Sequence, residues 1–92
     1  MLQNLLRQKF GVHEVDEVFR VNGYDAARKG DRLYMLVPVG AEEIKTISDR
    51  KLIVDHYLQN GDRNVCDFLQ TKEGEAVIGE EGRNFVILTS PV

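Results

Sequence analysis

The chain has 92 residues, of which 42% are hydrophobic and 29% charged, with 12 Lys and Arg against 15 Asp and Glu. This length allows one hydrophobic core, so we expect a single domain over residues 1–92, and the composition is typical of a globular protein. The formal net charge of −3 argues against the basic face of a general nucleic-acid-binding protein. Since no apolar run approaches the ~20 residues of a membrane-spanning helix, we expect neither nucleic acid nor membrane as a partner.

The N-terminal segment is predicted to be a short helix. Its apolar residues recur at helical spacing and are followed by Gly11, at the position where a helix often ends with positive φ. These apolar residues are Leu2, Leu5, Leu6 and Phe10. The segment lacks the unbroken apolar stretch of a signal peptide and is too short for a membrane-surface anchor, so we expect an intracellular chain.

Residues 15–28 predict the first hairpin of an antiparallel sheet. A strand-like segment ending at Val21 leads into Asn22-Gly23, a strong signal for a two-residue turn because both positions accept positive φ. The chain then returns as a second strand over residues 24–28.

The apolar segment Arg32–Val37 predicts the third strand, after a tight turn at residues 29–31. Its continuous apolar character indicates that both faces of the sheet are at least partly covered, with Leu36 in the core. Pro38 cannot donate to a neighbouring strand, so it predicts either the strand end or a free sheet edge.

A long helix is predicted to begin after Gly40 and to end at Asn60. The acidic pair Glu42-Glu43 lies in its first turn, where the helix dipole favours negative charge. We therefore interpret this pair as a helix start and not as a metal or acid–base site.

The long helix is imperfectly amphipathic. Its apolar stripe also contains Lys51, while Leu52 and Ile53 fall outside it and are expected to meet something other than the sheet. The apolar members of the stripe are Ile44, Ile47, Val54, Tyr57 and Leu58.

The rest of the chain predicts three more strands, over residues 65–69, 76–78 and 84–88, with a turn at residues 79–82. The predicted fold class is therefore α+β. It comprises an antiparallel sheet of about five to six strands, one long helix packed on it and a short N-terminal helix.

The sequence contains no complete set of catalytic residues. His13 and His56 have no Cys or His near them at the spacing of zinc ligands. Cys66 lies in a strand-like run with no histidine nearby to lower its pKa, which indicates a small apolar side chain and not a nucleophile. We expect no catalytic residue, no metal and no cofactor.

Several short motifs, taken together in this order, carry a family resemblance. They are Phe10-Gly11-Val12, Asn22-Gly23-Tyr24, Leu33–Leu36, Tyr57–Asp62, Phe68–Gly74 with its Thr-Lys-Glu-Gly hairpin, and Phe85–Leu88. The chain resembles the N-terminal lobe of a protein-kinase-like fold of the aminoglycoside phosphotransferase branch. It is most similar to the spore-coat-associated kinase-like proteins of endospore-forming bacteria, of the YutH and CotS types.

The resemblance implies a nucleotide lobe, but this sequence departs from it at the phosphate-binding positions. In a working kinase, a lysine of the third strand pairs with the nucleotide phosphates and with a helix glutamate. Val37 occupies the position of that lysine, and Asn22-Gly23 offers one glycine in place of a phosphate-wrapping loop. The three residues are therefore interpreted as vestigial nucleotide-pocket positions.

The favoured hypothesis is a non-catalytic interaction or scaffold domain, the degenerate upper lobe of a spore-coat-associated kinase-like protein and part of a longer natural chain. Its expected location is the mother-cell cytoplasm or the spore coat. Its expected partners are a C-terminal kinase-like lobe, a spore-coat protein or a second copy forming a homodimer. The candidate contact surfaces are the apolar last strand, Phe85–Leu88, and the pair Leu52 and Ile53.

Two alternatives stay open. In the first, the chain is the nucleotide-binding lobe of a small-molecule phosphotransferase whose catalytic lobe lies outside these residues. In the second, it is a regulatory or adaptor domain unrelated to kinases. A long helix that does not pack across the three-stranded meander would favour the last interpretation.

Overall fold

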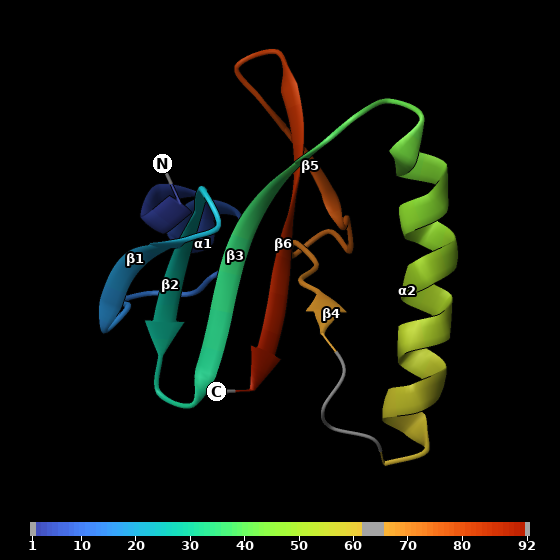
Figure 1. The fold of residues 1–92 in the computed structure, drawn as a ribbon, viewed down its shortest axis with the longest axis horizontal. Helices are drawn as coiled ribbons and strands as arrows, with labels where there is room; N and C mark the ends of the chain where they lie inside the picture. Colours follow the sequence, from blue (N-terminus) through green and yellow to red (C-terminus); the bar gives the residue numbers. More distant parts are fainter. Residues whose placement is uncertain (1, 62–65, 92) are drawn as a thin grey trace.

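The computed structural model describes residues 2–61 and 66–91 (Figure 1). In this part of the chain it has two helices and six strands. They are α1 Leu2–Lys9, β1 Glu17–Val21, β2 Tyr24–Lys29, β3 Arg32–Val39, α2 Glu43–Gln59, β4 Asp67–Phe68, β5 Val77–Glu80 and β6 Arg83–Pro91. The predicted α+β class, with its antiparallel sheet and its short and long helices, is confirmed.

The sheet is organised around its last strand. The spatial order is β1-β2-β3-β6-β4, and every neighbouring pair is antiparallel. On its other side β6 pairs with β4 near its C-terminal end and with β5 near its N-terminal end. The β1–β2 turn forms as predicted, with φ of 52° at Asn22 and 85° at Gly23.

The predicted end of the third strand at Val37 is wrong, because β3 continues through Pro38 to Val39. Pairing between β2 and β3 ends at Ala26 opposite Met35, so beyond this point β6 is the only partner of β3 among the described strands. Pro38 has no N–H to donate, and this is tolerated because one side of β3 is free at this point. A free edge was the second of the two outcomes that Pro38 predicted.

The last strand is also longer than predicted, since it runs through Thr89 to Pro91. The reason is tertiary: these residues lie opposite the first residues of β3, with Arg32 paired to Pro91. The turn predicted at residues 79–82 narrows to Glu81-Gly82 because β5 extends to Glu80.

The strand predicted over residues 65–69 is shorter than expected, because β4 covers Asp67–Phe68 only. Val65 lies outside the described residues.

Each face of the sheet carries its own apolar cluster, as the apolar third strand predicted. On one face α1 buries Leu2, Leu5 and Leu6, with Leu6 0% exposed. They join Ala27, Leu36, Ile78, Phe85 and Ile87 in what we call the α1 cluster. The apolar residues of α1 therefore belong to the core of the domain.

On the opposite face lies the α2 cluster, formed by Ile47, Phe68 and Val86. The helix meets the sheet at its β4 edge and does not cross β1, β2 and β3 (Figure 1). The predicted helix stripe is therefore only partly buried: Ile47 is buried, whereas Tyr57 and Leu58 are exposed.

The prediction that Phe85–Leu88 forms a contact surface is wrong. Phe85, Val86 and Ile87 are buried, because β6 is a central strand whose two faces are covered by the two clusters. By contrast, Leu52 and Ile53 are exposed on α2, as predicted.

Candidate functional site

Val37 lies where the resemblance places a phosphate-binding lysine, and the structure surrounds it with hydrocarbon. It stands opposite Val86 in the β3–β6 ladder. Its side chain packs against the α2 cluster, which includes Ile47 of the helix. The contacts of Val37 that the structure shows are therefore aliphatic.

Lys51 is the helix cation on the side of α2 that faces β4, and it is already paired. Its Nζ lies 2.8 Å from Asp67 Oδ1 and 3.1 Å from Asp55 Oδ1. Its side chain is only 15% exposed and that of Asp67 is 19% exposed.

The electrostatics of Lys51 follow from these two carboxylates. Burial lowers the pKa of Lys51, but the hydrogen bonds to Asp67 and Asp55 and their negative charges raise it more, so its net pKa lies above the ordinary value. The charge of Lys51 is balanced inside the chain and is not directed toward an external anion.

The Asn22-Gly23 turn is exposed and carries no phosphate-binding loop. Arg20 donates from Nη2 to the Gly23 carbonyl oxygen and from Nη1 to Asp25 Oδ1 at 3.0 Å. The guanidinium nearest the turn is therefore bound to acceptors of its own hairpin. The β2–β3 ladder does not extend to the turn, so no strand pairing brings Asn22 and Gly23 beside Val37.

A small apolar hollow lies on the sheet face that carries the α2 cluster. It is next to Val37 and the Asn22-Gly23 turn, but these residues do not line it. Its volume is about 160 Å³, below the range of roughly 300–1,000 Å³ that is typical of ligand pockets. The lining residues are Phe19, Val21, Ala26, Leu33, Tyr34, Met35, Cys66, Leu88 and Ser90. None of these lining residues has a charged side chain that could bind a phosphate.

Cys66 borders the apolar hollow and is not an activated thiol. Its side chain is exposed, but neighbouring atoms shield the thiol in part from water, which raises its pKa. The negative charge of Asp67 raises this pKa further, although Arg32 acts in the opposite direction. A thiol of this kind is protonated at neutral pH, which makes it a poor nucleophile.

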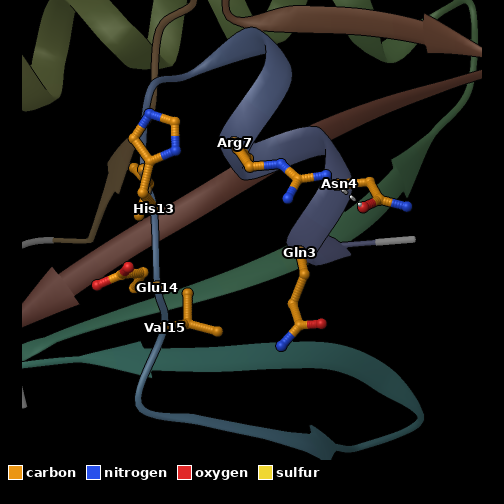
Figure 2. Close-up of a pocket in the computed structure, with 7 residues that line it drawn as sticks. Gln3, Asn4, Arg7, His13, Glu14 and Val15 are labelled. Carbon is orange, nitrogen blue, oxygen red and sulfur yellow. Dashed lines mark hydrogen bonds between the residues drawn. The ribbon is translucent and has the colours of Figure 1, made fainter.

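A larger polar cleft of about 480 Å³ lies between α1 and the segment that leads to β1. Figure 2 shows Gln3, Asn4 and Arg7 on the helix, with His13 on the segment opposite, and these residues line the cleft. Arg7 makes one long hydrogen bond to Asn4, with 3.5 Å between Nη2 and Oδ1. All four side chains are exposed, so the cleft has polar walls but no desolvated group that would perform chemistry.

Within residues 2–61 and 66–91, no group of three or more His, Cys, Asp or Glu side chains is arranged to hold a metal ion. His13 lines the polar cleft and His56 lies on α2, so the structure does not bring the two histidines together. Of the described helices, none has the length and apolar character needed to cross a membrane.

Sequence reasoning missed the apolar hollow and the Lys51–Asp67 pair. The hollow joins residues of β1, β2, β3 and β6, and only their tertiary register brings them together. The ion pair could have been predicted from Lys51 itself. A lysine inside the apolar stripe of a helix needs a carboxylate on the element against which that stripe packs.

Comparison with known proteins gives one positive result. No match was found among curated proteins or among solved structures. The model of the family described as "Spore coat putative kinase YutH" matches residues 3–92. The helix α2 does not cross the meander, which was the arrangement expected of a regulatory or adaptor domain unrelated to kinases. The family match covers nearly the whole chain and shows that the resemblance to this family is not fortuitous. The chain therefore belongs to the spore coat putative kinase YutH family.

Proposed function

We propose that this chain is the upper lobe of a kinase-like fold and that it works in the spore coat by binding protein surfaces, without transferring phosphate. Family membership supports the association with the spore coat and with kinases. The order of elements supports the lobe: a three-stranded meander, a helix, and later strands that return beside β3. A second kinase-like lobe or a coat protein is the proposed partner.

The observation that carries the non-catalytic role is the hydrocarbon around Val37. Phosphoryl transfer depends almost entirely on positioning and charge stabilisation, and in kinases a strand lysine paired with a helix glutamate supplies part of both. Here the strand offers a valine that packs against the α2 cluster. The polarity of the helix ion pair is reversed, with the lysine on α2 and the carboxylate on β4.

The test is a titration of the ¹⁵N-labelled chain with Mg-ATP, followed through the amide signals of Asn22, Gly23 and Val37. We expect no saturable shift at concentrations up to about 1 mM, because no described cation at these positions is left to bind phosphate. A saturable shift at all three amides that Mg²⁺ alone does not produce would reject the non-catalytic role.

The apolar hollow favours a second candidate function, that of a nucleotide-binding lobe. The hollow lies on the same sheet face as Val37, and most of its lining side chains are apolar, as the binding of a nucleotide base would require. Titration with adenosine, which has no phosphate, separates the two candidates. Saturable shifts at Ala26 and Met35 would favour the second candidate, whereas unchanged amides with both adenosine and Mg-ATP favour the first.

A further inference from the structure

The outward side of α2 carries the most exposed large aliphatic residues in the described part of the chain. Leu52 is 70% exposed and Ile53 is 57% exposed. Two adjacent aliphatic side chains at this exposure lose the favourable free energy of burial, and such patches commonly mark protein–protein contacts.

These residues belong to a defined stripe of the helix. Asp49, Leu52, Ile53 and His56 have the spacing i, i+3, i+4 and i+7, which places them on one face. We call them the outer stripe. At 100° per residue they lie opposite Ile47 and Lys51, which face the sheet and β4. The outer stripe therefore points away from the rest of the chain.

The outer stripe is complementary to itself when two copies of α2 run antiparallel. With a two-fold axis between residues 52 and 53, Leu52 of each copy lies against Leu52 of the other and Ile53 against Ile53, because the two residues lie on opposite sides of the centre of the stripe. At both ends of this aliphatic centre, Asp49 then faces His56 of the second copy, where an imidazole N–H can donate to a carboxylate. A parallel pairing would place Asp49 against Asp49, which like-charge repulsion disfavours.

We propose that two copies of this chain associate through the outer stripes of α2, antiparallel and about a two-fold axis between residues 52 and 53. The inference deepens the proposed interaction function, on which it rests, by naming a second copy as the partner. One pair of helices buries less area than a standard stable interface of about 1,600 Å², so the dimer is weak and forms at high local concentration.

The experiment is sedimentation equilibrium of the 92-residue chain in a reducing buffer, over a protein concentration of about 10 µM to 1 mM, the range in which weak interfaces equilibrate. The wild type is expected to shift from monomer to dimer within this range. Leu52→Glu is expected to abolish the dimer, while Val18→Glu, at an exposed valine of β1, leaves it unchanged. A wild type that stays monomeric at the highest concentration overturns the inference.

A charge exchange tests the antiparallel register. Asp49→Lys is expected to weaken the dimer by about tenfold, since a lysine then faces His56. The double variant Asp49→His with His56→Asp is expected to restore the wild-type Kd, because each acid again faces an imidazole. A dimer that ignores Asp49→Lys, or that the double variant does not restore, contradicts this register. Circular dichroism of each variant verifies that the helix is retained.

The result is distinguishable from that of the Mg-ATP titration. Saturable Mg-ATP binding by a chain that still dimerises through α2 would reject the proposed non-catalytic role alone. A strictly monomeric chain that does not bind Mg-ATP would reject the dimer alone.

Discussion

The two helices of this chain are attached to the sheet in opposite ways. The eight residues of α1 bury three leucines in the α1 cluster. The 17 residues of α2 bury Ile47 at the edge of the sheet and tie Lys51 to β4 through an ion pair. The shorter helix is therefore part of the core, whereas the longer one leaves its outer stripe free for another surface.

The largest expected effect is in the α1 cluster. Leu36→Ala should lower the free energy of unfolding by about 2–5 kcal/mol, because Leu36 is buried there and its removal leaves a cavity. Urea denaturation measures the change. A loss under about 1 kcal/mol would show that the cluster is not the main core.

The next effect concerns the attachment of α2. Lys51→Met should cost about 1–3 kcal/mol, because it leaves the partly buried Asp67 carboxylate without its cation. The matched control is Lys45→Met on the same helix, where an exposed lysine is replaced and a change within about 0.5 kcal/mol is expected. Equal losses in the two variants would refute an anchoring role for the Lys51 pair.

The same ion pair predicts a pH dependence. Since the folded pKa of Lys51 lies above the ordinary value of 10.5, the folded chain retains this proton where the unfolded chain releases it. The stabilisation is therefore complete below pH 10.5 and is lost as the pH rises through the folded pKa. In denaturant melts over this alkaline range, the free energy of unfolding of the wild type should approach that of Lys51→Met as the pH rises. A constant difference between them would contradict the shift.

A smaller effect is expected at Cys66, beside the apolar hollow. Because partial shielding from water and the charge of Asp67 raise its pKa, alkylation by iodoacetamide should reach half its maximal rate at a higher pH in the folded chain than in the same chain unfolded in urea. A folded midpoint at or below the unfolded one would mean that the thiol is activated.

The smallest expected effect is on the outer stripe. At protein concentrations where the chain is monomeric, Leu52→Ala should change the free energy of unfolding by no more than about 0.5 kcal/mol, since the side chain is 70% exposed. Comparison with Ile47→Ala on the inner side gives the contrast directly. Similar losses at both positions would show that the outer stripe is not free.

Local patterns in the sequence were enough for much of the fold. The leucine spacing of α1 and the Asn22-Gly23 turn fix their own backbone conformation, and both were predicted correctly. The end of β3 and the length of β6 could not be predicted, because each depends on which strand lies alongside.

At the candidate site too, local features could be predicted from the sequence, whereas features that depend on distant segments could not. The resemblance predicted that Val37, a hydrocarbon side chain, stands where a working kinase has a lysine. The sequence could not show which side chains surround Val37 or which carboxylates hold Lys51, because these partners come from distant segments. Nor could it show that Phe85–Leu88 is enclosed, since an apolar central strand and an apolar surface strand have the same residue pattern.

The most direct test of the account is whether Mg-ATP binds saturably to the chain at Val37 and the Asn22-Gly23 turn. We expect unchanged amide signals at these positions up to about 1 mM nucleotide, because Val37 packs with aliphatic side chains and Lys51 is held by two carboxylates. Saturable shifts at Val37, abolished when the triphosphate is replaced by adenosine, would contradict it.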